Sequence, residues 1–180
     1  MPVWLERLAI AIASLALSVG LIAVLSGFFA GQDQAGVSGS TSNVGQQFAD
    51  LGHAHLPPDA LHPAYDSDPP TSGPHVPVPV TTDQTTLTDD QLLQALEVGD
   101  VVIMYGGLRP PPGLRQLAGT AGNFTPALAA AGQAVILARR PGTVGLIGLA
   151  WTRMVRVSAP SDPLLKQFVQ VWLGHGAPGR

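Results

Sequence analysis

The sequence predicts an α+β protein, with one membrane helix at the N-terminus followed by a small mixed β-sheet flanked by helices. Three observations carry this prediction. An uncharged apolar run comes first, a proline-rich segment follows, and from residue 87 short apolar runs alternate with helix-start and helix-stop signals. The chain of 180 residues has room for one compact domain beyond the apolar run.

Residues 8–30 form the apolar run, which contains neither a charge nor a proline. A helix of this length spans about 35 Å, enough to cross a hydrocarbon core of roughly 30 Å. Arg7 precedes the run and Asp33 is the first charge after it, which favours residues 1–7 inside the cell and the C-terminal part outside. A cleaved signal peptide is the alternative, although its apolar run is normally shorter.

Small residues recur four positions apart within this run, as the pairs Ala16 with Gly20 and Ala23 with Gly27. Such spacing lets a second helix approach closely in a bilayer, although alanine-rich runs also produce it by chance. We therefore expect this helix to contact lipid and to pack against the helix of a larger membrane protein.

Two segments separate the membrane helix from the predicted domain. Residues 31–47 are rich in Gly, Ser, Gln and Asn, which indicates a flexible linker. Residues 48–86, called the strap below, hold eight prolines and four of the five histidines. The prolines exclude a regular helix, and the scattered apolar residues favour an extended segment laid over the domain.

Residues 87–180 carry the signals of regular structure. Thr88 and Gln91 predict a capping box, and Gly99 is placed to end that helix. Further helices are expected over 114–118 and 126–131 and from Pro163 to Gly174, and strands over 101–105, 134–139 and 144–157. The helical connection between the first two strands favours a parallel pair, and the short turn before the third favours a hairpin. A thioredoxin-like arrangement fits this order.

Composition narrows the function. The chain has no cysteine, which excludes disulfides, thiolate catalysis and Cys-based metal sites. Residues 31–100 carry ten acids and no base, whereas 101–180 carry eight bases and one acid. We expect the acidic strap to neutralise the basic domain, with an acidic partner or anionic lipid as the alternative. Neither a catalytic residue set nor a nucleic-acid partner is expected.

The most distinctive motif lies in the strap and reads Pro-Pro-Thr-Ser-Gly-Pro-His, residues 69–75. With the preceding Gly52-His-Ala-His and the later Leu92 to Gly99, it resembles the bacterial extracytoplasmic family known as domain of unknown function 3105. The resemblance implies a protein of the bacterial cytoplasmic membrane. We expect Pro69, Pro70 and Gly73 of the motif to have a structural role or to contact a partner. The resemblance also implies two helix histidines that this chain replaces with Gln94 and Val98, keeping Glu97, so the chain is a divergent member.

The strap histidines are the candidate metal ligands. His55, His62 and His75 could together hold Cu(II) or Zn(II), with neighbouring aspartates orienting the imidazoles. The alternative is that they cap turns and bind backbone groups, in which case the protein holds no cofactor.

Trp151 and Arg153 share one face of the third predicted strand. Trp151 is expected in the core, and Arg153 is expected to latch the strap by pairing with Asp66 or Asp68. With no catalytic set, the leading hypothesis is a non-catalytic accessory subunit that binds a larger membrane complex, such as an electron-transfer complex, through both its helix and its exported domain. The alternative is a periplasmic copper- or zinc-binding protein.

Overall fold

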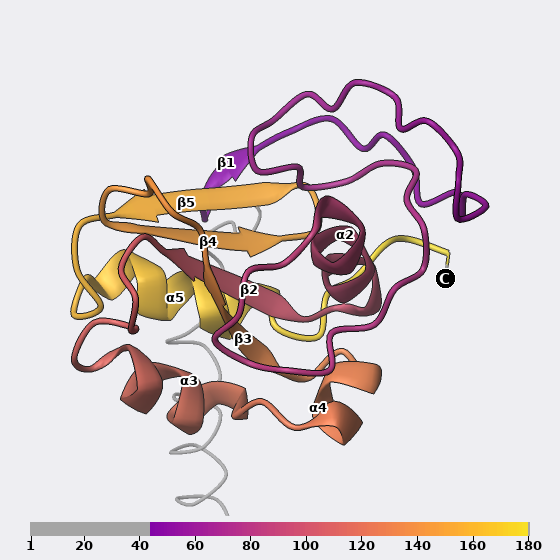
Figure 1. Cartoon of the computed structure of the whole chain (residues 1–180). Coiled ribbons are helices and arrows are strands. Elements are labelled where there is room, and N and C mark those ends of the chain that lie inside the picture. Colours follow the sequence, from indigo (N-terminus) through magenta and orange to yellow (C-terminus); the bar gives the residue numbers. More distant parts are fainter. Residues whose placement is uncertain (1–43, 180) are drawn as a thin grey trace, which may run out of the picture. The chain divides into compact units, whose positions relative to one another are not determined.

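The computed structural model describes residues 44–179. The expected membrane helix over 8–30, with Ala16, Gly20, Ala23 and Gly27, lies outside the described residues. Among residues 44–179, no helix combines the length and the apolar character needed to cross a membrane. This part of the chain holds a five-stranded sheet and four helices, which confirms the expected α+β class (Figure 1).

The strands are β1 Gln46–Gln47, β2 Val101–Tyr105, β3 Val135–Arg139, β4 Leu146–Ala150 and β5 Arg153–Val157. Their order in the sheet is β1-β5-β4-β2-β3. Strand β2 pairs in parallel with β3 and antiparallel with β4, and β5 runs antiparallel to both β4 and β1. The expected parallel pairing of β2 with β3 is therefore confirmed.

The single long strand expected over 144–157 is wrong. These residues form β4 and β5, an antiparallel hairpin that reverses at Trp151 and Thr152. Thr152 has a φ of +57°, and its N–H donates to the carbonyl of Thr71 at 2.9 Å. The hairpin expected between the second and third strands is also wrong, because β4 pairs with β2. Neither Trp nor Thr is a usual turn residue, so no local signal marks this reversal.

The helices are α2 Asp89–Val98, α3 Leu114–Gly122, α4 Pro126–Ala130 and α5 Pro163–Trp172. The capping box at Thr88 and the left-handed Gly99 at the end of α2 are both confirmed. The side chains of Thr125 and Asp162 cap α4 and α5. Helix α3 continues four residues beyond the expected end at Ala118.

The sheet buries apolar side chains on both faces, because successive residues of β2 point to opposite sides. Val101, Ile103 and Tyr105 belong to the cluster that includes α3 and α5. Val102 and Met104 belong to the cluster that includes α2 and α4. Helices α2 and α5 therefore cover opposite faces of the sheet (Figure 1).

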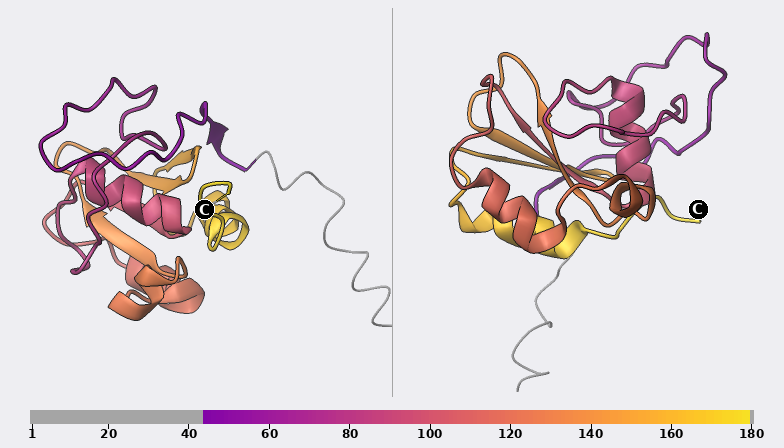
Figure 2. Two further views of the ribbon diagram at one scale, coloured as in Figure 1. Left: turned by 90° about the vertical axis from the view of Figure 1, so that its right-hand side faces the viewer. Right: turned by 60° about the horizontal axis from the view of Figure 1, so that its bottom comes forward.

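The strap passes over the α2 side of the domain and contacts the sheet near both edges (Figure 2). At its start, the N–H of Phe48 donates to the carbonyl of Thr152 at 3.0 Å. At its end, Gln84 N–H donates to Leu137 O at 2.7 Å, and Arg139 N–H donates to Thr85 O at 2.8 Å. The strap thus covers the outer edge of β3, which would otherwise expose unpaired backbone groups.

Candidate metal centre

Residues 69–75 join the strap to the rest of the domain. Pro69, Pro70, Thr71, Ser72, Gly73 and His75 are buried. The carbonyl of Thr71 accepts the N–H of Thr152 in the β4–β5 turn. The Ser72 hydroxyl donates to Ala49 O at 2.9 Å. Gly73 has a φ of +132°, and a Cβ there would lie 2.8 Å from the ring of Tyr65. The motif therefore has a structural role that requires a small residue at position 73.

His55, His75 and Glu97 converge at the point where the strap crosses α2. The Nε2 atoms of His55 and His75 lie 3.0 Å and 3.1 Å from the same oxygen, Glu97 Oε2. One candidate ligand atom from each residue lies within 4.8 Å of the other two. His75 is fully buried and Glu97 nearly so, whereas the His55 side chain is about half exposed. The cluster therefore has a protein-facing side and a solvent-facing side.

Backbone pairing holds the two histidines together. Leu56 N–H donates to His75 O at 2.9 Å, and His75 N–H donates to Ala54 O at 3.1 Å, which forms an isolated parallel bridge. The two imidazole centroids are 5.5 Å apart. Glu97 lies on the last turn of α2, so a strap segment and a helix supply the cluster jointly.

The tautomer of His75 follows from its surroundings. Its Nδ1 lies 2.9 Å from the carbonyl oxygen of Gly73, so Nδ1 carries a proton that it donates there. In the neutral ring, Nε2 then presents a lone pair towards Glu97. Although 3.1 Å from Oε2, this buried Nε2 makes no properly oriented hydrogen bond within residues 44–179. An imidazole whose other nitrogen binds a backbone carbonyl is typical of a metal ligand.

The residues present fit a divalent transition metal. Imidazole and carboxylate are ligands that Zn(II) and Cu(II) accept, with Zn–N and Zn–O bonds near 2.0–2.2 Å. Tetrahedral ligands at such distances lie about 3.3 Å apart, close to the separations from Glu97 Oε2. A pocket of about 380 Å³ is lined by residue Glu97 together with Val98, Gly176 and Ala177.

The structure places the other strap histidines elsewhere. His62 Nε2 lies 2.9 Å from Asp90 Oδ1, so His62 does not join His55 and His75. The His53 ring contacts Trp151, with centroids 6.3 Å apart. Residue Glu97 takes the third position, which the sequence reasoning assigned to His62. The signal that could have found it was the retention of Glu97 in a helix that has lost both expected histidines.

The comparison with family models identifies the family. The model described as "Protein of unknown function (DUF3105)" matches residues 61–179. The chain belongs to this family. Residues His75 and Glu97 lie within the matched DUF3105 range, and His55 precedes it. No curated protein and no solved structure matches the chain.

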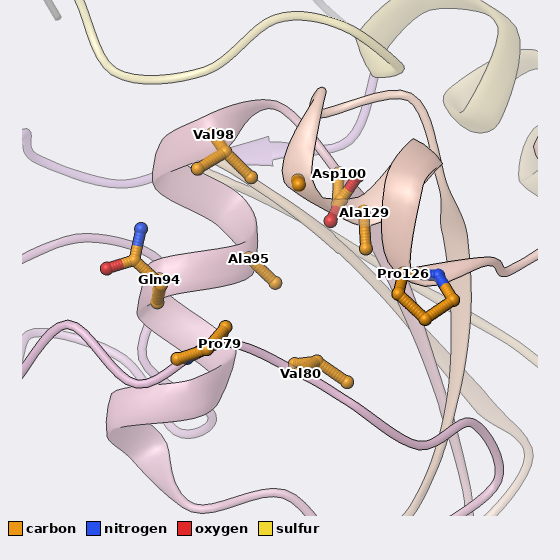
Figure 3. Close-up of a pocket in the computed structure, with 9 residues that line it drawn as sticks. Pro79, Val80, Gln94, Ala95, Val98, Asp100, Pro126 and Ala129 are labelled. Atoms are coloured by element: carbon orange, nitrogen blue, oxygen red, sulfur yellow. The ribbon is translucent and has the colours of Figure 1, made fainter.

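Gln94 and Val98 of α2 stand where the resemblance to the DUF3105 family implies histidines. These two residues are among those that line a different pocket, an apolar one of about 240 Å³ between α2, α4 and the end of the strap (Figure 3). Asp100 is the one acid that lines it, and its Oδ1 accepts the N–H of Ala134 at 2.8 Å. The cluster at Glu97 therefore offers a metal the better set of ligands.

Arg153 does not latch the strap, contrary to the sequence-based expectation. Asp68 instead forms an ion pair with Arg140, and its backbone carbonyl accepts from Arg156 at 2.8 Å. Asp66 Oδ2 accepts the N–H of Ala49 at 3.0 Å. Trp151 is buried, as expected for a core residue.

Proposed function

We propose that this DUF3105 protein is an exported, membrane-anchored metal-binding protein that holds one Zn(II) or Cu(II) ion between His55, His75 and Glu97. The convergence of two imidazole nitrogens on one buried carboxylate oxygen carries the proposal. The orientation of His75, with Nδ1 bound to a carbonyl and Nε2 left without a hydrogen bond in the described part, supports it.

A cation would satisfy all three groups at once. A buried carboxylate and a buried imidazole lone pair that face each other are unfavourable unless a proton or a metal ion lies between them. Two neutral imidazoles and one carboxylate leave a dipositive ion with a net charge of +1 and an open coordination position. The half-exposed side chain of His55 leaves one side of the cluster open to solvent.

The test is equilibrium dialysis of the full chain, purified in mild detergent, against Zn(II) and separately against Cu(II). Metal content is then measured by elemental analysis. We expect one ion per chain, and loss of at least tenfold in affinity for Glu97→Gln and for His75→Ala. Cobalt(II) substitution should give the intense visible absorption of a four-coordinate site in the wild type alone.

His62→Ala is the matched control, because it removes an imidazole of the strap that pairs with Asp90 outside the cluster. This variant should bind metal as the wild type does. If the wild type binds neither ion, or if Glu97→Gln binds as tightly, a proton bridges the cluster and the metal proposal is wrong.

An accessory role in a larger membrane complex is a second proposal, and exposed apolar side chains support it. Leu108 and Val144 are 81% and 96% exposed on two loops that meet where Gly106 packs against Thr143. Exposed apolar side chains on neighbouring loops of a domain with few charges are typical of a contact surface.

Capture of the tagged full chain from gently solubilised membranes tests this role. We expect a stoichiometric complex of high mass that Val144→Asp dissociates. Leu61→Asp is the control, because Leu61 is as exposed (95%) but belongs to the strap and to neither of these loops. A free chain of low mass would contradict the accessory role and leave the metal proposal standing.

We also propose a more specific fold for the α+β domain. The parallel pair β2–β3, the antiparallel hairpin β4–β5 and the closing helix α5 support a thioredoxin-like arrangement. Because the chain has no cysteine, such a fold would carry no dithiol chemistry here. An experimental structure with β4 outside the position between β2 and β5 would contradict this assignment.

A further inference from the structure

Arg153 is a buried cation without an anionic partner among residues 44–179. The residue is 9% exposed, and its side chain makes no hydrogen bond or ion pair within that range. The guanidinium carbon lies 4.7 Å from the ring centroid of Trp172. Trp172 is itself fixed, because its Nε1–H donates to Val44 O at 2.9 Å.

A second residue with an unpaired donor, Trp151, also lines this pocket. Trp151 Nε1 is buried and has no hydrogen-bond partner within the described residues. Trp151, Arg153 and Trp172 line a cavity of about 350 Å³ beside the start of the strap, together with Phe48 and His175. Aromatic walls around a single guanidinium suit a ligand that has both an apolar body and an anionic group.

The neighbouring acids do not neutralise Arg153. Asp68 is paired with Arg140, and Asp66 binds the backbone of Ala49. Asp50 lines the pocket, but it is exposed and accepts the N–H of Gly52 at 2.9 Å. A largely buried arginine without a counter-charge is unfavourable, and the pocket beside Arg153 has room for an external anion that would supply one.

We propose that this pocket binds the carboxylate of a small aromatic or aliphatic acid, with Arg153 as the anion-binding residue. Arg presents a fork of N–H donors that matches the two oxygens of a carboxylate. Asp50 at the same pocket disfavours a dianion such as phosphate more than a monoanion. Trp151 and Trp172 would pack against the apolar body of the ligand.

This pocket is separate from the metal cluster. Its lining residues do not include His55, His75 or Glu97, and the two sites use different side chains throughout. Failure of the carboxylate proposal would therefore leave the metal proposal unaffected.

The test uses benzoate as the probe and benzamide as its neutral analogue, with the full chain in mild detergent. Binding is followed by titration calorimetry and by the fluorescence of the indoles. We expect saturable binding of benzoate, at least tenfold weaker binding of benzamide, and no saturable binding of inorganic phosphate. Arg153→Met should weaken benzoate binding at least tenfold, whereas Arg109→Met, which removes an exposed charge elsewhere, should not change it.

A second measurement uses thermal unfolding. Benzoate should raise the melting temperature of the wild type and not that of Arg153→Met, because only a ligand that binds the folded state stabilises it. Loss of the contact between Arg153 and the Trp172 ring changes the melting temperature of the ligand-free variant in any case, so the shift caused by benzoate is compared within each protein. Equal binding of benzoate and benzamide, binding of phosphate alone, or an unchanged response of Arg153→Met to benzoate would each overturn the proposal.

Discussion

At the scale of single residues, the strap is held by side chains that each have a different partner. The hydroxyl of Ser72 binds the backbone of Ala49, and the hydroxyl of Tyr65 donates to Pro74 O at 3.0 Å. His75 binds Gly73 through one nitrogen and faces Glu97 with the other. These contacts explain why a segment without a helix or strand of its own has a defined course.

Tyr65 should make the stability of the domain sensitive to alkaline pH. Burial, and then the nearby Asp89 and Asp90, raise the pKa of Tyr65 above its usual 10.0. The folded protein therefore holds this proton more tightly than the unfolded chain, so the free energy of unfolding falls as the pH rises above about 10. Denaturant unfolding between pH 9 and 11 should show a smaller fall for Tyr65→Phe.

Tyr105 is the comparison for this experiment. Burial is also the main cause that raises the pKa of Tyr105, with Asp83 adding to it. Because the chain has two tyrosines, the double Phe variant should lose the tyrosine contribution entirely. An alkaline fall as steep in the double variant as in the wild type would contradict the assignment.

At the scale of elements, local sequence predicts the bounds of the helices well and the pairing of the strands less well. The capping box at Thr88, the caps at Thr125 and Asp162 and the left-handed Gly99 can all be read from neighbouring residues. The β4–β5 turn cannot, because the left-handed Thr152 at this turn donates its N–H to the carbonyl of Thr71, a strap residue distant in sequence. Strand pairing likewise depends on contacts distant in sequence.

Thr88→Ala should destabilise the domain through α2. The Thr88 side chain accepts the N–H of Gln91 at 3.2 Å, and the Gln91 side chain accepts the N–H of Thr88 at 3.1 Å. Loss of an N-cap of this kind costs about 1 kcal/mol in the free energy of unfolding. Thr86→Ala, two residues earlier and outside the helix, is the control and should change stability by less than about 0.5 kcal/mol.

Thr152→Gly should stabilise the hairpin. A β-branched residue in the left-handed region is strained, whereas glycine adopts this φ of +57° freely. We expect a gain of up to about 1 kcal/mol in unfolding free energy, since the strain relieved exceeds the added entropy of the unfolded chain. Thr86→Gly, at a residue without positive φ, should instead lose stability. A loss at Thr152 measured by denaturant unfolding would contradict this account.

At the scale of the whole molecule, the strap contacts both edges of the sheet and helix α2, and so connects these parts of the domain. It begins beside β5, passes α2 and ends along β3. The ion pair of Asp68 with Arg140 adds little stability, because Asp68 is largely exposed. Buried Thr71, which accepts the N–H of Thr152, and the backbone bonds of Phe48, Gln84 and Thr85 are therefore stronger links between the strap and the domain.

Metal binding should stabilise the whole domain if the proposed centre is correct. At a free Zn(II) concentration one hundred times the Kd, the free energy of unfolding should rise by about 2.7 kcal/mol. Because His55 and His75 bracket the strap loop between them, the ion should also slow proteolysis of that loop. Neither effect is expected in Glu97→Gln, and both should persist in His62→Ala.

The sequence by itself determined those features that depend on residues within a few positions of one another. These are the helix caps, the buried strands β2 and β3, the extended character of the strap and the family motif at residues 69–75. The α+β class followed from their order.

Only the tertiary structure decided the candidate sites. His55 and Glu97 are 42 residues apart, and Asp68 and Arg140 are 72 apart. Which of several histidines joins Glu97, and which arginine joins Asp68, depends on where the strap crosses α2 and the sheet. That course is set by many buried contacts acting together, and no single local pattern in the sequence encodes it.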